Sequence, residues 1–401
     1  MNSRRVSKLL RPELVDITIL GVHVKSAGYP NVTFRIRGLF DTPSLNIREI
    51  NFPFSARTSH HVFHSRAWRP LKVVWAAIRL IYAHFHILFA YFWHGRPHRL
   101  YIPYPSTFVL LCLLPLPRSW RPDHIVADCF ISLYDTVVTD RELISPVSWA
   151  ARSLKSLETR AYRTADVIVV DTDLNASYFT ETFGIAASKI LILPLSIDES
   201  VFRPVTYLPH DDPCTVLFIG TFVPLQGVEV IAQAAVILST SKNIRFRIIG
   251  FGQTADAVSR IFASGQQVNV EWITKWMDSK HLAKEIRSAD ICLGIFGAGT
   301  KAQRVWPLKN YLYMAIGRPL ITGDTPTARH MLQKADSAPF LTVPNGDPDA
   351  LAAAIIDLAK DLDRRRGYAA NASLFYNKHL SSSIALEQIV SRLALNPAKD
   401  S

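Results

Sequence analysis

A β-rich run, a glycine loop, an apolar helix and a second β-rich run follow one another over residues 215–250, TVLFIGTFVPLQGVEVIAQAAVILSTSKNIRFRIIG. The two β-rich runs, residues 215–220 and 245–250, each end in glycine. Between them, residues 228–238 have their apolar positions at helical spacing. A strand, a helix and a strand of these lengths predict one unit of a parallel sheet covered by helices.

The same alternation extends over the rest of the chain. In the second half, strands are also expected at 268–273, 290–296, 319–322 and 339–343, and helices near 254 and at 281–288, 308–316, 327–334 and 347–361. In the first half, strands are expected at 17–22, 46–50, 100–103, 125–128, 167–171 and 190–195, and helices at 32–40, 71–92, 107–114, 148–164 and 175–183. We therefore expect an α/β protein with two Rossmann-like, doubly wound domains, residues 1–205 and 206–375, that face each other across a ligand-binding cleft.

The composition excludes several classes of protein. Of the 401 residues, 49% are hydrophobic and 19% are charged, which is too apolar for a disordered chain. The four cysteines lie far apart in apolar runs and form no CxxC pair, so we expect neither a disulfide framework nor a metal site, and a reducing compartment such as the cytoplasm fits best. They are Cys112, Cys129, Cys214 and Cys292.

The positive charge is concentrated in the N-terminal third. The formal net charge is +12, and residues 1–120 carry 16 Lys and Arg against 4 Asp and Glu. A one-sided basic region indicates an anionic partner, which here means a membrane surface, a phosphorylated acceptor or a nucleic acid. No zinc-finger, RRM or helix-turn-helix signature accompanies the charge, so no nucleic-acid partner is expected.

The segment from Leu71 to Trp93 is long enough to span a bilayer but carries Lys72, Arg79 and two histidines. Its tryptophans and tyrosines are typical of a membrane interface. Three alternatives stay open for it: a transmembrane helix, a buried or half-buried helix of the domain, and a helix that lies on a membrane face. The first apolar run, residues 17–22, is interpreted as a strand and not as a signal peptide.

Residues 165–392 resemble a GT-B-fold glycosyltransferase of the large retaining family four, the glycosyl transferases group 1. Four stretches carry the resemblance in order: ADVIVVDTDLNASYF…KILILPLSIDESVFRP, VLFIGTFVPLQGVEVIAQAAVIL, RIIGFGQ and PLKNYLYMAIGRPLITGDTP. The resemblance implies transfer of a sugar from a nucleoside-diphosphate sugar to an acceptor hydroxyl, with retention and with neither metal nor cofactor. It also implies that residues 376–401 form a helix that crosses back to the first domain.

The sequence departs from the family at the residues that bind the donor. Thr221 and Gln226 stand where the family carries an arginine and a lysine. Arg304 and Leu312 stand where it carries two glutamates, the second of which holds the ribose hydroxyls. The sequence resembles a subgroup that lacks this ribose-binding glutamate. Either the donor site has been rebuilt around other residues, or it has lapsed and the chain serves as a scaffold or partner subunit.

The expected donor site combines glycine loops, helix N-termini and cations, which stabilise a departing diphosphate without metal. Each feature alone is also typical of a strand end or a solvated helix start. Lys301 and Arg304, placed just before or in the first turn of the helix at 308, are the candidate cations for catalysis. The expected donor-binding residues are Gly220, Thr221, Gln226, Gly227, Gly252 and Lys309.

On the acceptor side, Asp135 in the segment CFISLYDTVVTDR is the candidate for orienting the acceptor hydroxyl, with a solvated loop acid as the alternative. Gly21, His23 and Lys25 follow the first strand and are expected to face the cleft. The stretch 171–173, Asp-Thr-Asp, matches a metal signature of another glycosyltransferase fold, but after a strand it is interpreted as a turn and helix cap.

These expectations add up to a hexosyl- or related transferase of cell-surface polysaccharide or lipopolysaccharide synthesis. Its expected partners are a nucleotide sugar, a glycan or lipid-linked acceptor, and an anionic membrane surface. Its expected location is the cytoplasm, on the inner face of the cytoplasmic membrane. A sugar-nucleotide epimerase or hydrolase on the same fold is a third alternative, for which no acid/base pair can be identified.

Overall fold

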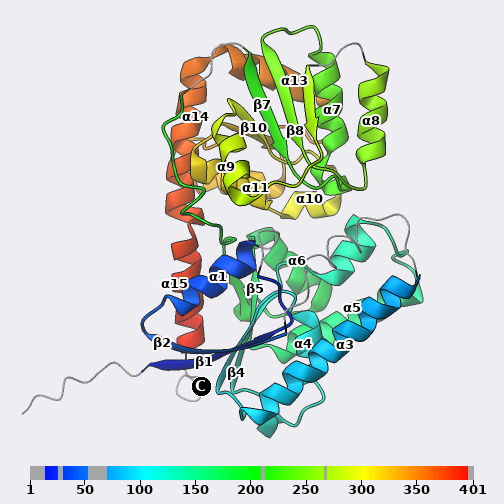
Figure 1. The fold of residues 1–401 in the computed structure, drawn as a ribbon, viewed down its shortest axis with the longest axis vertical. Coiled ribbons are helices and arrows are strands. Elements are labelled where there is room, and N and C mark those ends of the chain that lie inside the picture. The colour runs from blue at the N-terminus through cyan, green and yellow to red at the C-terminus, as the bar shows by residue number, and fades with distance from the viewer. Residues whose placement is uncertain (1–13, 26–29, 53–69, 209–212, 266–268, 396–401) are drawn as a thin grey trace, which may run out of the picture.

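The computed structural model describes residues 14–25, 30–52, 70–208, 213–265 and 269–395. They form two α/β units stacked one above the other, each with a six-stranded parallel sheet between layers of helices (Figure 1). This architecture confirms the predicted fold class. A boundary between the domains at residue 205 remains a prediction.

The first sheet has the strand order β2-β1-β3-β4-β5-β6, all parallel. Its strands are apolar runs because both faces of the sheet are buried. Along β1, Ile19 packs on one face and Leu20 on the other. The strands are β1 (Val15–Gly21), β2 (Leu45–Asn51), β3 (Arg99–Ile102), β4 (His124–Asp128), β5 (Val167–Val170) and β6 (Ile190–Ile192).

Helices cover the two faces of this sheet unequally. One face packs against buried side chains of α3 (Pro70–Trp93), α4 (Thr107–Leu113), α5 (Trp149–Thr164) and α6 (Asp173–Phe183). The other face packs against α1 (Pro30–Phe40) and α15 (Ser382–Ala394), the last helix of the chain. Short turns join the strands and helices, namely η1 (Arg118–Trp120), the π-helical η2 (Asp135–Asp140) and η3 (Ala187–Lys189).

The second sheet has the order β12-β11-β10-β7-β8-β9, also parallel. Its strands are β7 (Cys214–Ile219), β8 (Ile244–Ile249), β9 (Val270–Ile273), β10 (Ile291–Leu293), β11 (Leu320–Gly323) and β12 (Leu341–Val343). One face carries α7 (Val228–Ile237), α8 (Ala255–Ser264) and α13 (Pro348–Lys360). The other carries α9 (Ser279–Arg287), α11 (Leu308–Ile316) and α14 (Leu362–Phe375). The remaining elements are η4 (Pro224–Gln226), α10 (Thr300–Arg304), α12 (Pro326–Gln333) and η5 (Tyr376–Leu380).

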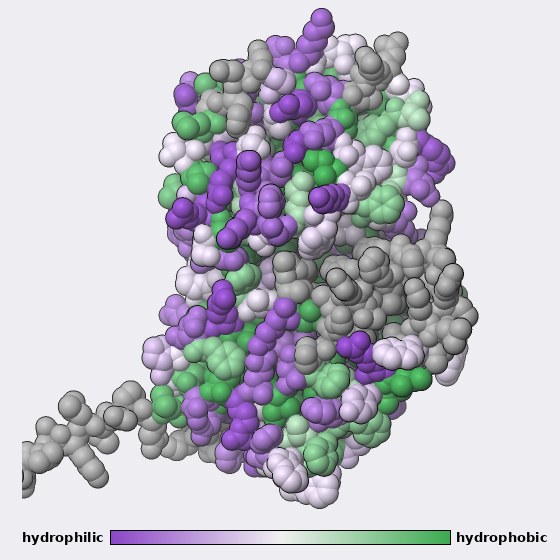
Figure 2. Space-filling model, viewed as in Figure 1, coloured by the Kyte–Doolittle hydropathy of each residue, from purple (hydrophilic) through white to green (hydrophobic). Residues whose placement is uncertain are grey.

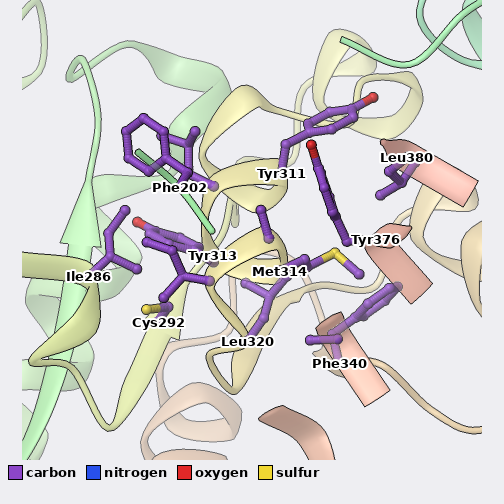
Figure 3. Packing of buried hydrophobic residues seen from close by; sticks show 14 of the residues in the cluster. Phe202, Ile286, Cys292, Tyr311, Tyr313, Met314, Leu320, Phe340, Tyr376 and Leu380 are labelled. Carbon is purple, nitrogen blue, oxygen red and sulfur yellow. The ribbon is translucent and has the colours of Figure 1, made fainter. Parts of the chain in front are cut away.

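The two units are tied together by α11 and by the C-terminal helices. Every residue of α11 after Leu308 is buried, and Tyr311 and Tyr376 lie side by side next to Met314 (Figure 3). Tyr376 and Leu380 come from η5, which leads from α14 into α15. In Figure 1, α14 and α15 run along one side of both units. His124 Nε2 lies 3.0 Å from the carbonyl oxygen of Arg392 on α15, so the end of the chain lies against the first sheet.

The predicted strands and helices are confirmed, with bounds that differ by a few residues at most. The segment at 71–93 forms α3, which has one buried face. No helix in the described ranges, α3 included, is long and apolar enough to cross a membrane. Sequence analysis missed α14, which follows α13 after only Asp361 and whose N-terminus is capped by the Asp361 side chain.

Candidate functional site

The second sheet reverses its winding direction between β7 and β10. From β7 the chain proceeds to β8 and β9 on one side, and then returns to place β10 on the other side of β7. Gly220 follows β7 and Gly294 follows β10, so both lie at the carboxyl edge of the sheet at this switch point. Open parallel sheets bind their ligands at this place.

Lys309, the second residue of α11, reaches the switch point. Its Nζ donates to Gln226 Oε1 and, at 3.4 Å, to the carbonyl oxygen of Gly294. The same nitrogen lies 3.7 Å from the centroid of the Phe218 ring. A Cβ atom on Gly220 would come within 2.8 Å of this nitrogen, so a side chain there would displace the ammonium group. Three of the predicted donor-binding residues are thus brought together.

The Lys309 ammonium group is buried without a counter-ion. Its residue is 7% exposed, and within the described part of the chain no carboxylate pairs with it. Burial lowers the pKa of Lys309 well below its ordinary value. An unpaired buried cation is unfavourable, so an anionic ligand at this point would stabilise the protonated form. The site is therefore suited to bind an anion.

The loop after β7 is built on close backbone approaches. Gly227 has φ of +62° and directly precedes α7, and a Cβ there would lie 2.5 Å from the Gly297 nitrogen. A Cβ on Gly252 would lie 2.6 Å from the carbonyl oxygen of Phe222. Thr221 is exposed in this loop. Gln226, whose side chain contacts the Lys309 ammonium group, lies two residues before the start of α7, so the N-terminus of this helix begins near that contact.

The three residues predicted to be catalytic meet at the boundary between the two units. Arg304 donates to Asp135 Oδ1, and Lys301 Nζ lies 3.3 Å from Asp135 Oδ2. Lys301 Nζ also lies 3.6 Å from Asp140 Oδ2 and donates to Thr136 Oγ1 at 3.2 Å. Both aspartates belong to η2 of the first unit, whereas both cations belong to α10 of the second. We call this set, Asp135, Asp140, Lys301 and Arg304, the interdomain ion cluster.

The helix that carries these cations differs from the prediction. Lys301 and Arg304 lie on the separate helix α10 and not in the first turn of α11. The break comes at Pro307, since a proline disfavours helical backbone at the residue before it. The Arg304 guanidinium stacks on the Tyr178 ring at 3.9 Å. Because α10 also packs against η4, the ion cluster adjoins the loop that holds Gln226.

Glu158, which sequence analysis missed, holds the segment that presents Asp135. Its carboxylate is fully buried on α5 and accepts hydrogen bonds from the backbone N–H groups of Leu133 and Tyr134, both at 2.8 Å. It also accepts from Ser132 Oγ at 2.7 Å and from the Tyr162 hydroxyl at 2.6 Å. A buried carboxylate bonded to several donors fixes their positions. The only signal of this role in the sequence is that a glutamate stands on the apolar side of the amphipathic helix α5.

Other acids near the carboxyl edge of the first sheet have structural partners. Asp128, at the end of β4, is fully buried and lies 2.5 Å from Arg35 Nη1. Asp171 accepts from Asn175 Nδ2 at 2.8 Å, and burial raises the pKa of Asp171 to about 6. Thr172 caps α6 by accepting from the Asn175 backbone N–H, which confirms the helix-cap interpretation of residues 171–173.

The residues predicted to face the cleft after β1 are engaged locally. His23 is fully buried, and its Nε2 lies 2.9 Å from Glu49 Oε1. Lys25 Nζ lies 2.5 Å from Glu49 Oε2, and a Cβ on Gly21 would come within 2.7 Å of His23 Nδ1. These residues pair with β2 at the sheet edge. Part of the predicted loop, residues 26–28, lies outside the described residues.

No group of histidine, cysteine and carboxylate side chains in the ranges that the structure describes could hold a metal ion. All four cysteines are free thiols. The described residues thus offer the switch point, with its glycine loop and Lys309, as the candidate ligand site.

The second domain matches a known protein family. Residues 213–361 match the family model described as glycosyl transferases group 1. The chain is 31% identical over 99 residues to D-inositol 3-phosphate glycosyltransferase of Acidothermus cellulolyticus. The matched region covers 22% of this chain and 22% of that protein. The match to this curated relative therefore spans less than two thirds of its length.

The fold of the whole chain is similar to solved structures. Sucrose-phosphate synthase from Thermosynechococcus elongatus superposes with a TM-score of 0.68 at 15% identity, over 94% of this chain and 97% of that one. HepE of Anabaena, solved with UDP and glucose, gives 0.67 at 12% identity, over 95% and 99%. TarM gives 0.56 at 12% identity, over 74% of this chain and 54% of that chain. These likenesses and the two parallel sheets show the GT-B fold.

Proposed function

We propose that this chain is a glycosyltransferase that moves a sugar from a nucleoside-diphosphate sugar to an acceptor hydroxyl. The observation that carries the proposal is the contact between Lys309 Nζ and Gln226 at the switch point of the second sheet. In the family that this domain matches, a lysine is usual at the position of Gln226. Here a cation reaches the Gln226 side chain, but it is supplied by α11 and not by the loop.

The geometry of the site suits a diphosphate leaving group. Lys309 provides one fixed cation, and the N-terminus of α7 provides backbone N–H donors beside it. Both are in place before the reaction, so negative charge that develops on the leaving diphosphate is stabilised without reorganisation. We therefore propose a reaction that needs neither metal nor cofactor and that proceeds with retention.

The proposed role of the interdomain ion cluster is alignment. Arg304 occupies one oxygen of Asp135 and Lys301 lies beside the other, so this carboxylate is poorly placed to accept a proton from an acceptor. By joining η2 to α10, the cluster fixes the first domain relative to the donor loop. Holding donor and acceptor in register contributes to the rate by orientation. Asp135, Lys301 and Arg304 are accordingly proposed as positioning residues.

The proposed acceptor is a glycan or lipid-linked hydroxyl compound of cell-surface polysaccharide or lipopolysaccharide synthesis. The proposed location is the inner face of the cytoplasmic membrane. The basic N-terminal third supports both, because it favours anionic partners.

A second candidate, a lapsed module that serves as a scaffold, is favoured by one observation. Leu312, at the family's ribose-binding position, is buried in an apolar cluster and has no group that could hold a ribose hydroxyl. A rebuilt site must bind the ribose through other atoms, whereas a lapsed site need not bind a nucleotide at all.

Calorimetric titration with UDP, GDP, ADP and dTDP separates the two candidates. A rebuilt site binds one of them, and Lys309→Met weakens that binding by about 1.5–3 kcal/mol, roughly tenfold to a hundredfold, which is typical of a hydrogen bond to a charged group. The matched control is Lys242→Met, an exposed lysine just before β8 and thus at the opposite edge of the same sheet.

Two results would argue against the proposal. Equal binding by wild type and Lys309→Met would remove Lys309 from the site. Absence of binding to any nucleotide at millimolar concentration, with the thermal midpoint unchanged by ligand, would favour the lapsed module.

A further inference from the structure

The helix α3 has two apolar faces on opposite sides. Ala83, Ile87 and Tyr91 belong to the buried core of the first domain. The opposite side is also apolar, although it faces outward. A surface helix of a soluble domain normally presents polar side chains there.

Eight large apolar side chains of α3 are exposed, each between 48% and 76%. Six of them, at positions 75, 78, 82, 85, 89 and 92, alternate in steps of three and four residues and form one stripe along the helix. Trp120 of η1, 55% exposed, extends this stripe through an edge contact with Phe92 at 5.8 Å. The α3 apolar face comprises Trp75, Ile78, Ile81, Tyr82, Phe85, Phe89, Phe92, Trp93 and Trp120.

The figures show where this face lies. In Figure 1, α3 runs across the outside of the first domain, on the far side from α14 and α15. In the same view, Figure 2 shows mostly pale and green side chains along α3, whereas purple side chains are frequent on the second domain. A continuous apolar surface of this extent marks an interaction site.

The charge of the segment that contains α3 indicates the kind of partner. Between Glu49 and Asp123 the sequence contains no Asp or Glu but nine Lys and Arg. Asp123 itself lies 2.6 Å from both Arg96 and His98, so its charge is compensated. A second copy of the chain would bring two of these basic segments together, which is unfavourable. A bilayer with anionic lipid offers apolar chains under negative headgroups and complements both properties.

We propose that the α3 apolar face docks on an anionic lipid bilayer, with the helix axis in the membrane plane. Tryptophan and tyrosine side chains, of which this face has several, favour the headgroup level. The apolar side chains then reach ~5–10 Å into the interface, as surface helices do. The helix does not cross the membrane, which agrees with the lack of a spanning helix among the described residues.

The topology places the docked helix near the expected ligand-binding edge of the first sheet. Since α3 follows β2 and precedes β3, it begins at the carboxyl edge of the first sheet, where parallel α/β sheets bind ligands. A bilayer along α3 therefore borders the carboxyl edge of the first sheet. If the proposed function holds, the acceptor reaches this edge from the membrane surface.

Vesicle co-sedimentation of the full chain tests the proposal. Vesicles with about 30% phosphatidylglycerol are expected to bind it at least about tenfold more tightly than phosphatidylcholine alone, and added salt should release it. Phe85→Ser/Phe89→Ser is expected to weaken this binding at least about tenfold. The matched control is Ile237→Ser/Leu374→Ser, two exposed apolar residues of the second domain, which should bind as wild type.

Phe85 and Phe89 are both exposed on α3, so Phe85→Ser/Phe89→Ser is expected to keep the thermal midpoint and the nucleotide binding of wild type. Equal vesicle binding by wild type and Phe85→Ser/Phe89→Ser would overturn the proposal. The proposal would also be overturned if wild type bound no vesicles but was a dimer by light scattering, and if Phe85→Ser/Phe89→Ser was a monomer. A chain that binds vesicles but no nucleotide would contradict the proposed function and leave the docking surface intact.

Discussion

Replacing Asp135 by asparagine breaks the interdomain ion cluster at its centre. Asp135 is 4% exposed and Arg304 is 7% exposed, so the guanidinium left behind cannot be resolvated. Removing one partner of a buried ion pair costs about 3–5 kcal/mol. The Tyr178 ring at 3.9 Å and the remaining Lys301–Asp140 pair offset part of this. We expect Asp135→Asn to lower the free energy of unfolding by about 3 kcal/mol.

A double-mutant cycle with Arg304→Met isolates the pair. Because the double variant leaves no unpaired guanidinium, it should cost less than the sum of the single variants, with a coupling energy of about 2 kcal/mol. Urea unfolding followed by circular dichroism measures all four proteins, provided that they share one m-value. The matched control is the exposed pair Asp363 and Arg366, whose coupling should be about 0.5 kcal/mol or less. A coupling for Asp135 and Arg304 no larger than that of the control pair would refute the view that this cluster joins the domains.

Three further predictions concern the glycine loop, the buried acid and the buried lysine. Gly227→Ala should lower the thermal midpoint more than Gly346→Ala, because both have positive φ but only the Cβ at 227 meets backbone, 2.5 Å from Gly297 N; equal midpoints would contradict this. Because the pKa of Asp171 is raised in the folded state, the free energy of unfolding should fall as pH rises from 3.8 to about 6. Asp171→Asn should therefore be about 2 kcal/mol more stable than wild type at pH 8, and urea titrations at several pH values should show that it lacks this pH dependence. At pH values between the lowered pKa of Lys309 and its ordinary value of 10.5, nucleotide binding should be accompanied by uptake of a proton at this residue. The binding heat measured by calorimetry should then depend on the buffer, and Lys309→Met should abolish this dependence.

The sequence predicted the sheets well because buried parallel strands are continuous apolar runs bounded by glycine and proline. It missed α14 for a physical reason. The buried residues of that helix are Arg365, Ala369, Ala372 and Phe375, and a stripe with an arginine and two alanines gives no clear apolar period. The π-helical η2 was also not predicted, since the residues that lead into it are held by Glu158, which lies 18 residues beyond the end of η2.

Predicting the site from the sequence succeeded for residue types and failed for their pairing. The cations were expected to face the diphosphate together, whereas Lys301 and Arg304 pair with acids of the first domain. These contacts join positions more than 150 residues apart, and local spacing carries no information about them. The contact between Gln226 and Lys309 spans 83 residues and was equally hidden.

The pairing decides which cation is left for a ligand. In the interdomain ion cluster two carboxylates face two cations, so its formal charge is balanced before any donor arrives. Lys309 is different, because burial without a carboxylate disfavours its charge. A diphosphate would add little to the balanced cluster but would supply Lys309 with the counter-ion that it lacks. The donor phosphates are therefore expected at the switch point beside Gly220, with the ion cluster holding the acceptor domain next to them.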